Sequence, residues 1–294
     1  MRDRPRKRRS TARPSARRAP AGAPGAIVLR AHGLQPCAVL ACALLACALL
    51  APSPAAAADP DLLLQLKLDE GSGTAADDAS GFGHDGTVVS GAGGPHWTAG
   101  KSGQALEFYN YNGTRTRYVR VPWQPTLQAT TGLTLMGWVH VRTITTGNQT
   151  VLGRGNSDTD WLLQLRNRAR RLTFVLASGS AVRTLNVNLA ANALAAGDWH
   201  HVAATYDGSR MRIYLDGVLR GNRAASGQVV SASNPNLPVG VGAQPQTPTR
   251  WRNGIPGALD DVRLYKRTLT AVEIQAAMNE AGPAITRLRW QENF

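Results

Sequence analysis

Cysteine is absent from most of this 294-residue sequence. All three cysteines lie between residues 37 and 47, and none occurs from residue 59 to the end. A domain that begins at residue 59 therefore has no disulfide bonds and no thiolate metal site. It must be held together by a hydrophobic core, and about 230 residues are enough to form one.

Acidic residues are almost absent from the first 58 positions. These positions contain ten of the 33 Lys and Arg residues but only one of the 19 Asp and Glu residues. The rest of the chain has 23 basic and 18 acidic residues, which gives +5. The formal net charge of +14 therefore belongs mostly to the N-terminus, and it does not indicate a nucleic-acid partner.

A long hydrophobic run is also lacking. The apolar run at residues 37–51 has 15 residues, fewer than the roughly 18 of a membrane-spanning helix. It follows an arginine-rich stretch and precedes APSPAAAADP, as in a secretory signal. We therefore expect residues 1–58 to be a signal segment cleaved after Ala58, and the protein to be secreted or displayed at the cell surface.

The route of export stays open between the Sec and twin-arginine pathways. LLAC at residues 44–47 resembles a lipoprotein cleavage box. The apolar run continues past Cys47, however, so we favour export without a lipid anchor and expect no membrane span.

Downstream of residue 59, short apolar stretches alternate with Gly, Asn and Asp, which is typical of an all-β domain. Period-2 alternation places Val202, Ala204 and Tyr206 on one face of a strand. Asp207 and Gly208 supply the positive φ angles of a tight turn, so we expect a hairpin there. The expected strands are residues 62–68, 86–91, 104–109, 117–122, 133–142, 149–154, 161–166, 171–177, 182–189, 199–206, 210–217, 237–242 and 258–267.

One short helix is expected over residues 268–282. Thr270 is the expected N-cap, and Glu273 three positions later completes a capping box. Leu269 and Ile274 form the matching hydrophobic staple. A single helix after the last strand is suited to covering a sheet.

Five stretches carry a family resemblance: LLLQLKLDEGSGTAADDASGFGHDGTV, SGQALEFYN, LTLMGWVHV, GDWHHVAATYDGSRMRIYLDGVLRG and GALDDVRLYKRTLTAVEIQAAM. Together they resemble the LamG-like jellyroll domains of the concanavalin A-like lectin/glucanase superfamily. The resemblance implies a two-sheet antiparallel jellyroll sandwich over residues 59–282, followed by a C-terminal tail at residues 283–294. It also implies a non-catalytic module of a secreted protein that binds carbohydrate or another partner, often with calcium.

DDASGFGHDG at residues 77–86 combines three aspartates, one histidine and three glycines. Calcium takes carboxylate and backbone carbonyl oxygens as ligands. The family resemblance implies that Asp260 faces this loop. We therefore expect one structural calcium ion bound by the side chains of Asp78 and Asp260, with carbonyls from Gly81 to His84.

Two alternatives stay open for this loop. Asp261 is the alternative carboxylate for the ion. Without a metal, Asp77 and Asp78 would cap a turn while Asp260 accepts hydrogen bonds from the backbone.

Aromatic and planar polar side chains are the candidates for sugar binding. Trp251 and Arg252 lie in a loop rich in Pro and Asn, and Tyr111 and Asn112 lie in another expected loop. Trp161 is a further candidate. Exposed aromatic and arginine side chains are enriched at binding surfaces, and the arginines near these loops favour an anionic partner such as a uronic-acid polymer or a sulfated glycan.

Motifs for catalysis are lacking. A retaining glycosidase needs two carboxyl groups about 5–5.5 Å apart, and the E-x-D-x-x-E-type motif of the superfamily's glucanases does not occur. We therefore expect a secreted carbohydrate-binding module without enzymatic activity. An adhesion module that binds a surface protein is the alternative, and a polysaccharide hydrolase or lyase is the third.

Overall fold

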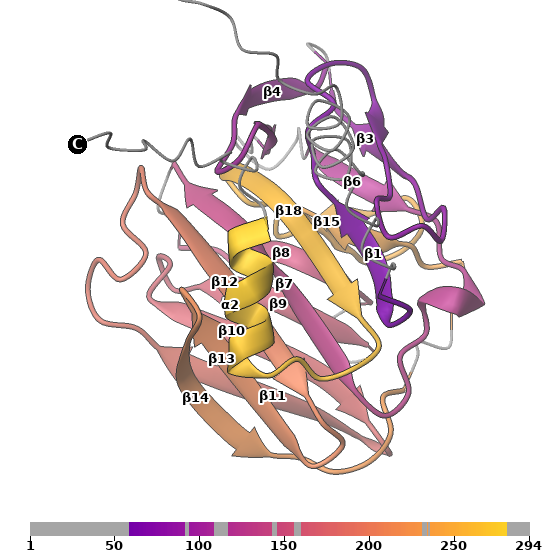
Figure 1. The fold of residues 1–294 in the computed structure, drawn as a ribbon, viewed down its shortest axis with the longest axis vertical. Helices are drawn as coiled ribbons and strands as arrows, with labels where there is room; N and C mark the ends of the chain where they lie inside the picture. Colours follow the sequence, from indigo (N-terminus) through magenta and orange to yellow (C-terminus); the bar gives the residue numbers. More distant parts are fainter. Residues whose placement is uncertain are drawn as a thin grey trace, which may run out of the picture. The chain divides into compact units, whose positions relative to one another are not determined.

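The computed structural model describes residues 59–91, 94–108, 117–142, 146–155, 160–230, 234 and 236–280. The predicted signal segment and the predicted tail at residues 283–294 lie outside these ranges. The described residues form two antiparallel β-sheets, a two-stranded ribbon, a short 3-10 helix η2 (Pro125–Leu127) and one α-helix (Figure 1). None of the helices described is long and apolar enough to cross a membrane.

The first sheet has eight strands. Its path is β14 (Val218–Ala224), β13 (Arg210–Leu215), β12 (Trp199–Tyr206), β7 (Leu133–Val141), β18 (Gly257–Tyr265), β5 (Gln104–Phe108) and β4 (His96–Ala99), and β1 (Leu62–Leu66) pairs with β18 off this path. Strand β18 therefore connects β1, the first strand of the domain, to the middle of this sheet.

The second sheet also has eight strands. Its order is β11 (Ala181–Asn188), β10 (Arg171–Ser178), β9 (Trp161–Arg166), β8 (Gln149–Arg154), β15 (Val239–Val241), β6 (Tyr118–Val121), β3 (Gly86–Val89) and β2 (Ala75–Ala76). The ribbon consists of β16 (Gln244–Pro245) and β17 (Trp251–Arg252).

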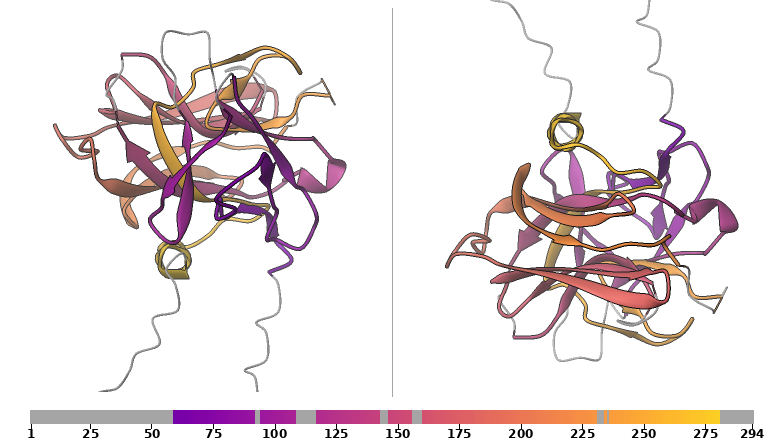
Figure 2. Two further views of the ribbon diagram at one scale, coloured as in Figure 1. Left: turned by 90° about the horizontal axis from the view of Figure 1, so that it is seen from above. Right: turned by 90° about the horizontal axis from the view of Figure 1, so that it is seen from below.

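The two sheets stack face to face and share one hydrophobic core (Figure 2). Strands of both sheets contribute alternate residues to it, such as Val202, Ala204 and Tyr206 on β12 and Leu163 and Leu165 on β9. The predicted all-β sandwich of two antiparallel sheets is thus confirmed. The predicted hairpin is confirmed as well, because β12 and β13 pair on either side of residues 207–209.

Helix α2 (Ala271–Glu280) covers the outer face of the first sheet (Figures 1 and 2). Ile274 and Ala277 pack there against Met136, Ala203 and Tyr214. The outer face of the first sheet is therefore partly a second, smaller core rather than an open surface.

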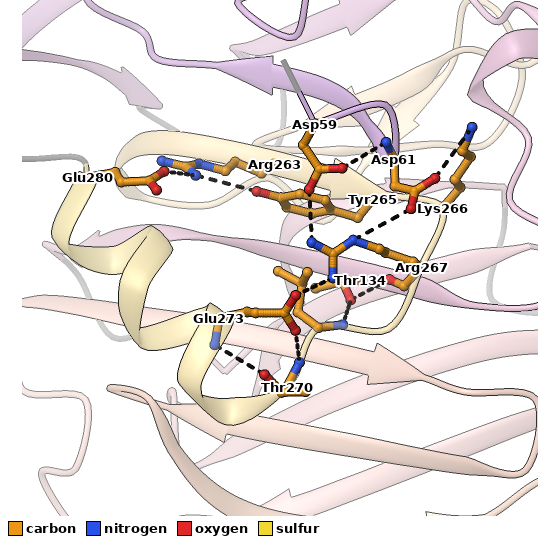
Figure 3. Close-up of polar contacts among 11 residues, drawn as sticks. Asp59, Asp61, Thr134, Arg263, Tyr265, Lys266, Arg267, Thr270, Glu273 and Glu280 are labelled. Atoms are coloured by element: carbon orange, nitrogen blue, oxygen red, sulfur yellow. Dashed lines mark hydrogen bonds and ion pairs between the residues drawn. The ribbon is translucent and has the colours of Figure 1, made fainter. Parts of the chain in front are cut away.

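The predicted capping box starts this helix (Figure 3). The backbone N–H of Glu273 donates to Oγ1 of Thr270 at 3.2 Å, and the N–H of Thr270 donates to Oε2 of Glu273 at 2.7 Å. Arg267 pairs with both Glu273 and Asp59, the latter at 2.9 Å. These contacts fasten the helix and the start of the domain to the end of β18.

All the expected strands are present, but β2, β4, β14, β16 and β17 were not predicted. Strand β14 reads VLRGNRA and is exposed along almost its whole length, because it is the last strand at one edge of its sheet. Period-2 alternation appears only where one face of a strand is buried. An exposed edge strand therefore lacks the signal by which strands are recognised.

Truncation of a core side chain tests the sandwich. Phe174 on β10 is fully buried, so we expect Phe174→Ala to lower the free energy of unfolding by about 3–5 kcal/mol through lost burial and a residual cavity. Phe82→Ala is the matched control, because Phe82 is 45% exposed, and it should cost less than about 1 kcal/mol. Urea unfolding measures both, and equal losses would contradict the described core.

Candidate functional site

The loop at residues 77–86 is closed by hydrogen bonds to Asp78. Its Oδ1 accepts from the backbone N–H groups of Gln65 at 2.9 Å and Ser80 at 3.0 Å. Its Oδ2 accepts from the Ser80 hydroxyl at 2.7 Å and the His84 N–H at 2.9 Å. Burial opposes ionisation, but these hydrogen bonds hold the pKa of Asp78 below its ordinary value.

The ring of His84 is buried in the same loop. Its Nδ1 lies 2.7 Å from the carbonyl oxygen of Leu63, and its Nε2 lies 2.8 Å from Oγ1 of Thr126. Both ring nitrogens are therefore engaged by the protein. Gly81 has a φ of +91°, a left-handed conformation that favours glycine in a turn.

Asp260 lies on β18, where it pairs with Trp138 of β7. Its Oδ2 accepts a hydrogen bond from the backbone N–H of Ser102 at 3.0 Å. Burial, together with the charges of Asp261 and Asp69, raises the pKa of Asp260 to about 7. The folded protein therefore holds a proton on this carboxyl group at mildly acidic pH.

Asp261, the alternative carboxylate, is engaged in a buried ion pair. Arg263 donates from Nε to Oδ1 of Asp261 at 2.9 Å and from Nη2 to Oδ2 at 2.7 Å. The side-chain amide of Gln65 also donates to Oδ1 at 2.8 Å. Arg263 reaches Glu280 of α2 at 3.0 Å as well (Figure 3). Asp261 thus serves to fix Arg263 beneath the helix.

The structure places strand β1 between the two predicted calcium carboxylates, Asp78 and Asp260. Strand β1 lies between Asp78 and β18, because Leu66 bridges to Asp78 on one side and pairs with Val262 on the other. Within the described part of the chain, no group of three or more His, Cys, Asp or Glu side chains could hold a metal. The contacts match the alternative interpretation, a hydrogen-bonded turn at Asp78 and an Asp260 that accepts from the backbone. Calcium binding itself stays a prediction.

Removal of the Asp78 carboxylate tests the turn. Asp78→Ala leaves its backbone donors without an acceptor, so we expect a loss of about 2–4 kcal/mol in the free energy of unfolding. The loss should be the same in calcium and in EDTA, and Asp77→Ala, an exposed neighbour, should change little. Urea unfolding in both buffers measures this. Calcium that stabilises the wild type but not Asp78→Ala would contradict it.

The raised pKa of Asp260 predicts a pH dependence of stability. Between about pH 4 and pH 7 the folded state holds a proton that the unfolded chain has released, so the free energy of unfolding should fall as pH rises through this range. Asp260→Asn should remove that part of the slope. Urea unfolding in EDTA at pH 4.5, 6 and 7.5 measures the difference, and identical slopes for variant and wild type would refute the assignment.

The prediction that Trp161 is a sugar-binding residue is wrong, because its side chain is buried. It is 2% exposed and packs in the core with Leu163 and Leu165. The period of two in WLLQLR explains this placement, because Trp161 shares its face with the core leucines. Gln164 and Arg166 take the opposite face and point away from the core.

Of the other four predicted binding residues, two lie within the described ranges and two do not. Tyr111 and Asn112 lie outside the described residues. Trp251 and Arg252 form β17, where Trp251 is half-buried and Arg252 is exposed. The Trp251 ring stacks on Tyr118 of β6, with ring centroids 3.8 Å apart and planes 16° apart.

A glycine allows Trp251 to lie directly on the second sheet. A Cβ at Gly240 of β15 would come within 2.6 Å of Cζ3 of Trp251 and 2.8 Å of Cδ of Pro245. Any side chain at this position would push the ribbon away from the sheet. The close approach therefore requires glycine at position 240.

A buried network of side-chain amides also holds the ribbon against the second sheet. Nε2 of Gln164 donates to Oγ1 of Thr150 at 2.9 Å and to Oε1 of Gln244 at 3.2 Å. Asn253 donates to the same oxygen of Gln244 at 2.5 Å, and Nη2 of Arg166 donates to Oε1 of Gln164 at 2.7 Å. Buried amides that lose their partners destabilise a fold, so this network holds the ribbon in one position.

We call the outer surface of the second sheet, together with its ribbon, the outer face. Its accessible side chains are Tyr118, Arg120, Arg166, Arg171, Asn186, Asn188, Trp251 and Arg252, and Gln164 and Thr173 are buried beneath them. Its polar side chains are held in place, since Thr173 donates to Asn186 at 2.8 Å and Arg171 donates to Asn188 at 2.9 Å. A partly exposed aromatic ring beside a few fixed polar groups is the composition of a ligand-binding surface.

Sequence reasoning missed Tyr118, Gln164 and Gln244. A signal for two of them was present, because Tyr118 and Gln164 occupy the outward positions of strands that were expected. Nothing in the sequence placed Gln244 beside Gln164, since 80 residues separate the two.

Residues 112–275, more than half of the chain, match the sequence profile of the family described as the concanavalin A-like lectin/glucanases superfamily. A search of curated proteins by sequence found no match.

Three solved structures show the same fold. Domain 4 of AbnA, a GH43 extracellular arabinanase from Geobacillus stearothermophilus, was solved in complex with arabinotriose; it has 19% identity and a TM-score of 0.54 over 74% of this chain and 98% of that domain. The binding domain of Paraclostridial Mosquitocidal Protein 1 has 13% identity and a TM-score of 0.57 over 75% and 52%. The binding domain of botulinum neurotoxin DC, solved in complex with SialylT, has 14% identity and a TM-score of 0.54 over 75% and 52%. The chain thus spans about half the length of these toxin binding domains.

Proposed function

Because the chain belongs to the concanavalin A-like lectin/glucanase superfamily, we propose that it is an exported, non-catalytic module that binds carbohydrate on its outer face. The observation that carries this proposal is the partly exposed Trp251, stacked on Tyr118 and held beside the amide network of Gln164 and Gln244.

The chemistry of the outer face suits a sugar. An aromatic ring offers an apolar surface to the C–H face of a pyranose or furanose, while amide and guanidinium groups can exchange hydrogen bonds with its hydroxyls. The buried side chains of Gln164 and Thr173 order the accessible Arg166 and Asn186 before a ligand arrives. Such preorganisation lowers the entropy that binding must overcome.

The fold relatives support the same class of ligand. AbnA domain 4 is described with arabinotriose and belongs to an extracellular enzyme, and the neurotoxin DC binding domain is described with SialylT. We extend carbohydrate binding and export from those proteins to this chain as part of the proposal.

Absence of catalysis is part of the proposal. Glu107, the one glutamate on a described strand, is engaged by Arg142 at 2.8 Å and by His96. Incubation with a polysaccharide panel should therefore produce no new reducing ends. If new reducing ends appear and Glu107→Gln abolishes them, the protein is a hydrolase and the non-catalytic proposal is wrong.

Calcium stays a separate proposal that comes from the family resemblance. Asp260, buried near Asp69 and Asp261, is the predicted ligand whose environment a cation would favour, whereas Asp78 is satisfied by backbone donors. Isothermal titration of EDTA-treated protein with calcium at pH 8 tests it. If calcium produces no heat of binding and no change in melting temperature, the calcium proposal is wrong.

A protein partner is the second candidate. Val218 and Leu219 are 50% and 46% exposed on β14, an edge strand of the first sheet. Exposed apolar side chains on an open edge can pair with another chain. This candidate predicts that the chain binds one protein and that free oligosaccharide does not compete with this binding. The variant Leu219→Lys should abolish the binding.

Trp251→Ala tests the carbohydrate proposal. We expect binding on a glycan array, and at least a tenfold loss of affinity in the variant, equivalent to about 1.4 kcal/mol. Phe82→Ala is the matched control, because Phe82 is an exposed aromatic residue outside the outer face. Melting temperatures confirm that both variants fold. Equal affinity of wild type and Trp251→Ala for every bound glycan would overturn the proposed site.

A further inference from the structure

The strands of the second sheet carry positive charge and no negative charge. None of the eight strands contains Asp or Glu, and together they contain Arg120, Arg154, Arg166, Arg171 and Arg183. Arg154 is buried and paired with Asp160. The strands of the first sheet, by contrast, include the acidic residues Glu107, Asp260 and Asp261.

The positive charge is concentrated where β9 turns into β10. Arg166 and Arg171 are directly opposite each other across the two antiparallel strands, and Arg168 and Arg170 lie in the turn between them. We call these four residues the arginine turn. Like charges directly opposite on a sheet are destabilising, so the fold alone gives no reason for this pairing.

No carboxylate compensates the arginine turn among the residues that the structure describes. None of its four side chains is within ion-pair distance of an acidic group there. Arg166 and Arg171 instead donate to the amide oxygens of Gln164 and Asn188, at 2.7 and 2.9 Å. Neutral acceptors orient a guanidinium group without cancelling its charge, so the charge remains available to an anion.

The backbone of the turn is held in an unfavourable conformation. Asn167, Arg168 and Ala169 have φ angles of 51°, 57° and 55°, although none is glycine. Such left-handed residues each cost free energy and persist where the surrounding structure imposes them, often at functional sites. The turn thus displays Arg168 and Arg170 in a defined way.

A hollow of about 210 Å³ lies at the turn. It is lined by Arg168, Ala169, Arg170, Asn192 and Leu194. Ligand pockets for drug-sized molecules start near 300 Å³, so this hollow suits one sugar unit or one anionic substituent. Arginine is the side chain best suited to bind the paired oxygens of a carboxylate or sulfate.

The arginine turn is continuous with the proposed sugar site. Arg166 donates to Gln164, and Gln164 donates to Gln244 in the ribbon that carries Trp251. We propose that the arginine turn binds the carboxylate or sulfate groups of an anionic polysaccharide whose sugar rings extend along the outer face toward Trp251. The inference rests on the proposed function and names its substrate class.

A polysaccharide fits better than a nucleic acid. Single-stranded nucleic acids are bound by rows of aromatic side chains on which successive bases stack. On the described outer face the aromatic side chains are Trp251 and Tyr118, and they stack on each other. The accessible amides of Asn186 and Asn188, beside the arginine turn, suit the hydroxyl groups of sugars.

Binding of charged and neutral polymers by the full chain tests the inference. The probes are polygalacturonate as the carboxylated polymer, dextran sulfate as the sulfated polymer, arabinan as the neutral polymer and single-stranded DNA. The Arg168→Gln/Arg170→Gln double variant removes two exposed charges of the turn. Arg210→Gln/Arg220→Gln is the matched control, because it removes two exposed charges from β13 and β14 of the first sheet.

We expect at least one anionic polysaccharide to bind the wild type at least tenfold more tightly than arabinan in 50 mM NaCl, and this preference to disappear in 500 mM NaCl. The turn double variant should lose at least tenfold of that affinity, and the control less than twofold. The anionic polymer that binds more tightly identifies carboxylate or sulfate as the group recognised.

Four results would overturn the inference. Equal losses in both double variants would indicate unspecific charge attraction. DNA that binds as tightly as the polysaccharides and depends on the same arginines would indicate a nucleic-acid site. Trp251-dependent binding of arabinan, without any preference for anionic polymers, would refute the inference and leave the proposed function intact. If no polysaccharide binds, the proposed function fails and the inference with it.

Discussion

Every strand of this domain has two faces, and only one of them can contribute to the shared core. Leucine, valine and aromatic side chains from both sheets fill the space between them, and all are buried. The opposite faces must then be covered or carry side chains that tolerate water. This constraint separates the structural parts of the molecule from the parts that are available for binding.

The surfaces of the two sheets that point away from the core are covered in different ways. Helix α2 covers part of the outer face of the first sheet and is fastened there by Arg263 and Arg267 (Figure 3). The second sheet is covered instead by the short β16–β17 ribbon, which rests on Gly240 and is held by Gln164. The ribbon leaves Trp251 partly exposed beside fixed amides, so the same packing that completes the fold also constructs the candidate site.

Charge follows the same division. The acidic side chains on or beside β1 and β18 are engaged by backbone donors, arginine or lysine, which makes them structural. The arginines of the second sheet are oriented by amides instead. An anion that reaches this surface would meet oriented guanidinium groups without a competing carboxylate among the described residues.

Local patterns in the sequence determined the sandwich, the capped helix and the inward face of most strands, because hydrophobic alternation and capping chemistry act over a few residues. The same alternation, applied to WLLQLR, could have assigned Trp161 to the core. Edge strands such as β14 escaped because exposure on both faces removes the alternation.

Only the tertiary structure decided which distant residues meet. It placed β1 between Asp78 and the strand of Asp260, which separates two carboxylates that the family resemblance had joined. It also brought Gln244 to Gln164 and Trp251 to Tyr118. These contacts depend on strand order and on where a loop folds back, and both are set by long-range pairing that no local pattern encodes.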